Sequence, residues 1–207
     1  MGKLILISMA VVIVIFVPLE VWGEDGGQWD ELRAWDEVKD NKIPVLVLRD
    51  AKVSVKQVDI VEYIINAKEV NSKRTLFLGW NEGIKKVSES FGVEVPTLQV
   101  QYTLNSTEAI IIHLMDKTSN EGYDGYTNLF YDQNGKIQKA FIRIYNVDEL
   151  NNIQLKIIIR HELGHALGLG HTNSKNDLMQ SIINMNYNAI SMLDLKALAH
   201  IYYGYMQ

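Results

Sequence analysis

The sequence lacks cysteine and an excess of positive charge, and each absence excludes something. Without cysteine among its 207 residues, the fold cannot be stabilised by disulfides, and cysteine usage does not indicate a compartment. The formal net charge of −5 provides no basic surface, so we expect no nucleic-acid partner. There is no internal repeat. The length supports one domain with a sizeable core, and a hydrophobic content of 47% is ordinary for a globular protein.

Histidine is scarce, yet three of the five histidines fall within residues 161–171, which read His-Glu-Leu-Gly-His-Ala-Leu-Gly-Leu-Gly-His. On a helix, His161 and His165 lie one turn apart on the same face, where two imidazoles can bind one Zn²⁺. Gly168 tolerates a positive φ and lets the helix end in a turn, so that His171 can become a third ligand. Three protein ligands leave one coordination position for water, which is typical of a catalytic zinc.

This run and a methionine downstream resemble a known zinc signature. Glu162 follows the first histidine directly and can reach a metal-bound water without being a ligand. The pattern His-Glu-x-x-His-x-x-Gly-x-x-His resembles the signature of the metzincin zinc metallopeptidases. Met179, eight residues after His171, resembles the methionine turn of the matrixin branch, the matrix metalloproteinase type. Residues 191–204 resemble the closing helix of that branch. At the level of the fold the resemblance spans residues 43–204.

The resemblance implies an α+β fold of the metzincin (zincin) type, with a twisted five-stranded mixed sheet, an active-site helix and a C-terminal helix. Runs of β-branched and alternating residues predict five strands, at residues 43–48, 97–103, 108–115, 126–131 and 137–145. Capping and periodicity predict four helices, at residues 54–68, 78–91, 149–167 and 191–204. Asn134-Gly135 predicts a hairpin between the last two strands.

The resemblance also implies the activity of a secreted zinc-dependent endopeptidase, which hydrolyses peptide bonds with a zinc-activated water. Glu162 would be the general base, and His161, His165 and His171 would bind one catalytic zinc. Met179 would form an apolar floor beneath the imidazoles. The protein, expected to be a monomer, would bind an extended protein or peptide substrate. The residues implied to contact this substrate are Tyr126, Thr127, Asn128, Leu129, Phe130 and Leu178.

Other functions and a second metal stay open at this stage. A zinc-binding pseudo-protease would bind peptides without cleaving them, although an intact Glu162 argues against it. A zinc amidase acting on cell-wall peptide would use the same ligands. Many matrixins bind calcium, and Asp116, Asp124 and Asp132 offer loop carboxylates for it. The latency that a propeptide cysteine gives many matrixins is excluded, because this chain has no cysteine.

The N-terminus predicts export. Lys3 precedes an apolar run at residues 4–19, and Gly23 offers a small residue for cleavage. We expect residues 1–23 to be a signal peptide, with a membrane anchor through residues 4–19 as the alternative. In either case the catalytic part lies outside the cytoplasm, and the membrane is a partner only if the anchor is retained.

Residues 24–42 are expected to form an N-terminal arm, and residues 43–207 the matrixin-like metallopeptidase domain. Four apolar residues in the arm lie three apart and predict a short amphipathic helix: Trp29, Leu32, Trp35 and Val38. We expect the arm to contribute little to the active site.

Overall fold

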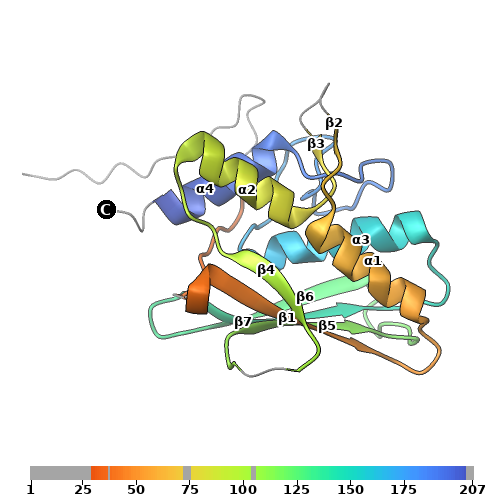
Figure 1. The fold of residues 1–207 in the computed structure, drawn as a ribbon. Coiled ribbons are helices and arrows are strands. Elements are labelled where there is room, and N and C mark those ends of the chain that lie inside the picture. The colour runs from red at the N-terminus through yellow and green to blue at the C-terminus, as the bar shows by residue number, and fades with distance from the viewer. Residues whose placement is uncertain (1–28, 37, 72–75, 104–105, 204–207) are drawn as a thin grey trace, which may run out of the picture.

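A computed structural model of the chain shows a mixed five-stranded sheet with helices packed on one face (Figure 1). The structure describes residues 29–36, 38–71, 76–103 and 106–203. The strands, in the order β4-β1-β5-β7-β6 across the sheet, are β1 (Lys42–Arg49), β4 (Thr97–Gln101), β5 (Ala109–Leu114), β6 (Gly125–Tyr131) and β7 (Ile137–Ile144). Strands β1, β4, β5 and β7 are parallel, and β6 pairs antiparallel with β7 at the edge. The predicted α+β fold with a five-stranded mixed sheet is confirmed.

The described helices are α1 (Val55–Asn66), α2 (Trp80–Phe91), α3 (Asn152–Ala166) and α4 (Met192–Tyr203). A 3₁₀ turn (Lys39–Asn41) precedes β1, and two short strands, β2 (Val70–Asn71) and β3 (Leu76–Phe77), pair with each other between α1 and α2. Across the described residues, every helix is too short or too polar to cross a membrane. The predicted signal peptide or anchor, residues 1–23, lies outside the described residues.

The core lies between the sheet and the helices. Alternate residues of the three central strands point toward the helices and are fully buried: Ile43, Val45, Ile110, Ile112, Ile142 and Ile144. Helix α3 contacts β6 and β7, with Ile158 and Leu163 buried in the core. This packing fixes the histidine-bearing helix beside the edge strand of the sheet.

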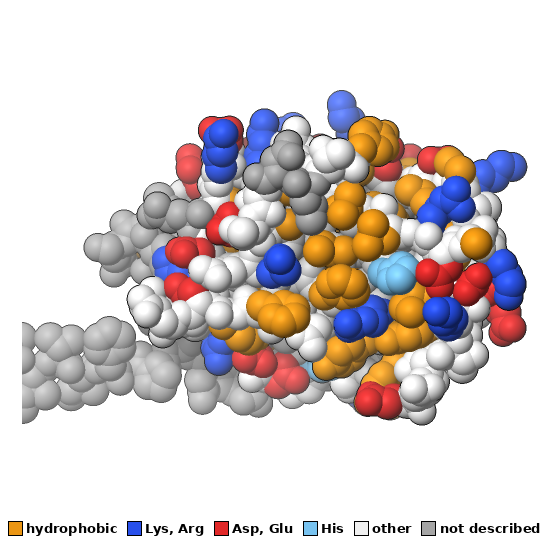
Figure 2. Space-filling view, turned by 90° about the horizontal axis from the view of Figure 1, so that it is seen from below, with side chains coloured by type: hydrophobic (Ala, Val, Ile, Leu, Met, Phe, Trp, Pro, Cys, Tyr) orange, Lys and Arg blue, Asp and Glu red, His pale blue; other side chains and the backbone are white. Residues whose placement is uncertain are grey.

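The opposite face of the sheet is covered by no described helix. Hydrophobic side chains gather across its centre, with Lys and Arg side chains beside them (Figure 2). The strand register assigns Leu46, Ile111 and Phe141 to this face as neighbours on three adjacent strands. The Arg143 guanidinium lies 4.5 Å from the centroid of the Phe141 ring, a cation–π contact that covers part of the apolar surface.

The N-terminal arm is extended at residues 29–36, so the predicted amphipathic helix is wrong. The backbones of three of its apolar residues form isolated β-bridges with different parts of the domain: Trp29 with Thr172, Leu32 with Leu169, and Trp35 with Ile137. A three-residue repeat is also the period of an extended polyproline chain, so the spacing does not distinguish the two conformations. Tertiary contacts decide here: Trp35 is buried, and its indole Nε1 donates to the carbonyl of Ala166 at 2.7 Å.

Two carboxyl groups are buried together where α4 begins. Ser191 Oγ donates to Oδ2 of Asp177 at 2.8 Å, and Oδ2 of Asp194 accepts from the backbone N–H of Ser191 at 2.7 Å. Burial, followed by the neighbouring Asp177 carboxylate, raises the pKa of Asp194 well above its ordinary value. Oδ1 of Asp194 is buried with no hydrogen-bond partner in the described part of the chain, so an ionised carboxylate there would be left without solvation on that oxygen.

Replacing Asp194 by asparagine is therefore expected to stabilise the fold by about 1–3 kcal/mol at pH 8, and by less at pH 5. A carboxyl whose pKa is raised in the folded state binds a proton that the unfolded chain has lost, so stability falls as the pH rises above the unfolded value of 3.8. Asparagine cannot ionise and still accepts from Ser191. Thermal unfolding at the two pH values measures the difference, with Asp59→Asn on the exposed side of α1 as the control. If Asp194→Asn were less stable than the parent at pH 8, the predicted direction of the stability change would be wrong.

Candidate metal centre and substrate cleft

Helix α3 begins at a side-chain cap and ends at a turn that presents the third histidine. Oδ1 of Asn151 accepts from the backbone N–H groups of Ile153 and Gln154 at 2.9 and 3.0 Å. The predicted start at residue 149 is three residues too early, because this cap defines the first turn. After the helix the chain reverses at Gly168, whose φ of 104° is one that residues with side chains rarely adopt.

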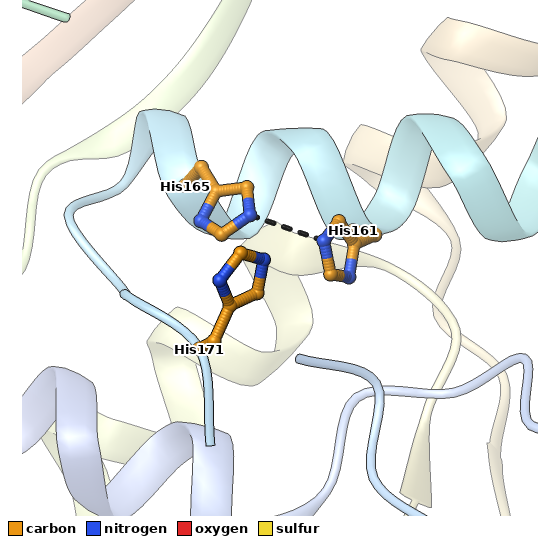
Figure 3. A group of neighbouring side chains, drawn as sticks. All are labelled: His161, His165 and His171. Atoms are coloured by element: carbon orange, nitrogen blue, oxygen red, sulfur yellow. Dashed lines mark hydrogen bonds between the residues drawn. The ribbon is translucent and has the colours of Figure 1, made fainter. Parts of the chain in front are cut away.

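The three imidazoles of the motif point into one space (Figure 3). Nε2 of His161 and Nε2 of His165 are 3.0 Å apart, and ligand atoms of these two residues and His171 lie within 4.8 Å of one another. No other group of three or more His, Cys, Asp or Glu side chains in the described ranges is close enough to hold one ion. Three convergent nitrogen donors fit a zinc ion with one position left open.

Hydrogen bonds fix the rings of the first two ligands. Nδ1 of His161 lies 2.7 Å from the carbonyl of Leu178, and Nδ1 of His165 lies 2.8 Å from the carbonyl of Leu169. A carbonyl only accepts, so each Nδ1 carries the proton and each Nε2 keeps its lone pair for a metal. Burial lowers the pKa of His161 to about 3 and that of His165 to about 4. Both rings are therefore neutral at pH 7, which is the form that binds metal.

The carboxyl group of Glu162 is buried beside this cluster. Oγ1 of Thr127, on β6, lies 2.6 Å from Oε2 of Glu162 and 3.1 Å from its carbonyl oxygen. Burial raises the pKa of Glu162 to about 7, and the hydrogen bond from Thr127 opposes this rise. Gly125 leaves room for the carboxyl, because a Cβ there would clash with Glu162 and Ile158. A carboxyl with a pKa near 7 can both accept and donate a proton at neutral pH.

Met179 packs against helix α3 at Gly164, which lies between the two helical histidines in the sequence. Its sulfur and methyl group occupy the space next to Gly164, where a Cβ would clash with them. The side chain is fully buried, so the contact is apolar and excludes water. Two hydrogen bonds to the backbone of Met179 hold the turn: its N–H donates to Oδ1 of the Asp177 side chain at 3.0 Å, and its carbonyl accepts from the backbone N–H of Thr172 at 2.9 Å. The role of Met179 as an apolar floor beneath the imidazoles stays a prediction.

The sequence profile of the matrixin family matches residues 80–203, more than half of the chain. The chain belongs to the matrixin family of zinc metallopeptidases. No curated protein matches it. A solved structure with a similar chain is high choriolytic enzyme 1, a hatching-enzyme zinc protease from the medaka fish Oryzias latipes. It has 12% sequence identity and a TM-score of 0.42 over 82% of this chain and 94% of that chain.

In this matrixin a cleft of about 780 Å³ runs past the three histidines and Glu162. Four of the residues predicted to contact substrate line it: Tyr126, Thr127, Asn128 and Leu129. They belong to β6, which is the edge strand, so one side of its backbone pairs with no other strand of the described sheet. Residues 181–183 and Met185 also line the cleft.

Two residues predicted to contact substrate lie away from the cleft. Phe130 is 51% exposed and does not line it. Tyr131 lines the cleft instead. The side chain of Leu178 is buried in the core, and only its carbonyl serves the site, as the acceptor for His161.

The N-terminal arm lines part of the cleft of this matrixin, contrary to the expectation that it contributes little. Three of its residues line the cleft: Asp30, Glu31 and Arg33. Within residues 161–171, Gly170 indicates that another segment packs closely against the chain there. Gly170 has no side chain, and a Cβ there would clash with Asp30 Oδ1 and the backbone of Glu31.

The loop carboxylates considered for calcium do not gather in this matrixin. Oδ1 of Asp132 accepts from the backbone N–H groups of Asn134 and Lys136, both at 2.8 Å, and so closes the hairpin between β6 and β7. Neither Asp132 nor Asp116 and Asp124 belongs to a metal-capable cluster among the described residues. The structure supports zinc and provides no support for calcium.

Proposed function

We propose that this matrixin is a secreted endopeptidase that binds one catalytic zinc through His161, His165 and His171 and uses Glu162 as its general base. The observation that carries the proposal is the placement of Glu162. Its carboxyl is buried next to the first ligand and lines a cleft beside a free edge strand, and burial brings its pKa to about 7. A site that only stored or displayed the metal would have no need of such a base.

The residues of the site divide the work of hydrolysis. When bound, zinc supplies a Lewis acid that activates water and polarises the scissile carbonyl. Glu162 takes a proton from the attacking water and then passes it to the leaving nitrogen. Thr127 holds the carboxyl of Glu162 in position through the 2.6 Å contact. Met179 keeps the helical turn between His161 and His165 packed and dry.

We propose that an extended peptide binds by adding a strand to β6. The unpaired backbone groups of that edge would hydrogen-bond to the peptide and align it along the cleft. The cleft is also lined by Ile182, Ile183 and Met185, so an apolar substrate side chain is favoured beside them. Backbone hydrogen bonds to β6 can form with any extended stretch of a substrate chain. This mode of binding favours cleavage at internal peptide bonds over trimming from an end.

Secretion is supported by the sequence alone, through Lys3, the apolar run at residues 4–19 and Gly23. Expression in a secreting host followed by N-terminal sequencing tests it. A mature protein in the medium that begins near residue 24 supports export with cleavage. A full-length protein in the membrane fraction supports the anchor instead.

The endopeptidase proposal is tested by incubating the chain with an unfolded protein and mapping the products by mass spectrometry. We expect internal cuts that a chelator abolishes and added zinc restores. Trimming confined to the ends would contradict an endopeptidase. If the unfolded protein substrate stayed uncleaved while a cell-wall peptide was hydrolysed, the amidase alternative would be supported.

Replacing Thr127 by valine is expected to lower kcat about tenfold, because a hydrogen bond to a charged group contributes about 1.5–3 kcal/mol. Thr127→Ser keeps the hydroxyl and should keep most of the activity. Thr97→Val makes the same change on β4, at the opposite edge of the sheet, and should leave kcat unchanged. Steady-state kinetics on a fluorogenic peptide measures the three variants. Equal activity of the valine and serine variants at position 127 would exclude a role for the hydroxyl.

A further inference from the structure

His171 differs from His161 and His165 in the group that lies next to its Nδ1 atom. Nδ1 of His161 and Nδ1 of His165 each face a backbone carbonyl. Nδ1 of His171 instead lies 3.5 Å from Oδ2 of Asp30, a carboxylate from the N-terminal arm. The other oxygen of the same carboxylate, Oδ1, accepts from the backbone N–H of His171. Asp30 thus contacts both the ring and the backbone of this one residue.

The arm is hydrogen-bonded to the whole turn that carries His171. The backbone N–H of Asp30 donates to the carbonyl of His171 at 3.0 Å, and that of Arg33 donates to the carbonyl of Gly168 at 2.9 Å. Two residues further on, the indole of Trp35 donates to the last residue of α3 at 2.7 Å. The arm is therefore attached to the turn at its beginning, its middle and its end.

Two glycines make this close approach possible. A Cβ at Gly168 would clash with the carbonyl of Arg33, and a Cβ at Gly170 would clash with Oδ1 of Asp30. Gly168 also adopts a positive φ, which explains a glycine there without the arm. Gly170 does not have a positive φ, so its lack of a side chain is explained by the neighbouring arm.

We propose that residues 29–35 are a permanent part of the zinc site, in which Asp30 is the positioning residue for His171. The inference rests on the proposed role of His171 as a zinc ligand. With Nε2 directed to the metal, Nδ1 carries the ring proton and faces the carboxylate of Asp30. Such a carboxylate fixes the tautomer and the orientation of the ring and makes the ligand more basic. Asp30 then accepts from the ring N–H of His171, as the carbonyls of Leu178 and Leu169 accept from the ring N–H groups of His161 and His165.

The test is the dissociation constant for zinc, measured on the full chain by competition with a chromophoric chelator and without any substrate. Loss of a partner of this kind weakens metal binding about 10–100-fold, and we expect about tenfold for Asp30→Ala because Asp30 is 61% exposed. Asp30→Asn should be intermediate, since an amide oxygen can still accept from the backbone of His171. Asp36→Asn removes the same charge from the same arm beside Lys136, and should bind zinc like the parent.

Thermal unfolding of the metal-free proteins accompanies the titrations, so that a folding defect is distinguished from weaker binding. Parent-like zinc affinity in both Asp30 variants would overturn the inference, and so would an equal loss in Asp36→Asn. Parent-like zinc affinity together with faster peptide cleavage by Asp30→Ala would identify the arm as an inhibitory segment and would also overturn it. Tenfold weaker zinc binding by Asp30→Ala, in a protein whose parent cleaves no peptide, would uphold this inference while the endopeptidase proposal fails.

Discussion

Replacing Glu162 by glutamine is expected to lower kcat for peptide cleavage by about 10²–10⁴-fold and to leave the zinc content unchanged. Glutamine has nearly the same shape and can keep a hydrogen bond to Thr127, but it cannot take a proton from water. The carboxyl of Glu162 lines the cleft beside His161, so the loss falls on proton transfer and spares metal binding. Zinc analysis and steady-state kinetics on the same preparations measure both quantities.

The exposed residue Glu62, on α1, provides the matched control, since Glu62→Gln makes the same chemical change far from the cleft. It should leave both kcat and zinc content at the parent values. A Glu162→Gln protein that lost its zinc would show that Glu162 is needed for metal binding. Retention of parent activity would remove Glu162 from the mechanism altogether.

Replacing Arg160 by methionine is expected to lower the free energy of unfolding by about 2–4 kcal/mol, since a hydrogen bond from a charged group contributes about 1.5–3 kcal/mol. Arg160 precedes the first ligand and is only 1% exposed. Its Nε and Nη2 donate to the carbonyl of Leu78 at 3.2 and 3.0 Å, and its Nη1 donates to the carbonyl of Asn188 at 2.5 Å. Burial lowers the pKa of Arg160 to about 10, so it stays charged at pH 7.

Methionine fills a similar volume and donates to neither carbonyl, so the variant isolates the hydrogen bonds from the packing. Arg49→Met is the matched control, because Arg49 is exposed and donates to a single carbonyl, that of Val53, at 2.7 Å. We expect the control to cost less than about 1 kcal/mol. Denaturant unfolding measures both variants. If Arg160→Met were as stable as the parent, the buried guanidinium would not hold these two segments together.

The cluster of three histidines was predictable because its geometry is local. His161 and His165 lie one turn apart on any helix, and a glycine that accepts a positive φ is needed wherever a helix ends in such a reversal. The strands were predictable because β-branched residues alternate in them, and the hairpin because Asn134-Gly135 suits its turn. In each case the residues that decide the structure are neighbours in the sequence.

The arm and the buried arginine were not predictable, because remote partners decide their structures. Asp30 and His171 are separated by 141 positions, and no local pattern reports their contact. The spacing of the apolar residues in the arm fits a helix and an extended chain equally well. A charged residue inside a helix is ordinarily solvated, and Arg160 is buried only because the carbonyls of Leu78 and Asn188 converge on it.

In the proposed site, three histidines hold one zinc and leave Glu162 free to act as the base. Anomalous diffraction from crystals of the zinc-loaded protein, collected on both sides of the zinc absorption edge, tests this most directly. We expect one strong peak within bonding distance of Nε2 of His161, His165 and His171, with the carboxyl of Glu162 close by but not coordinated. A peak elsewhere, or one in which Glu162 or another side chain fills the fourth position, would contradict it.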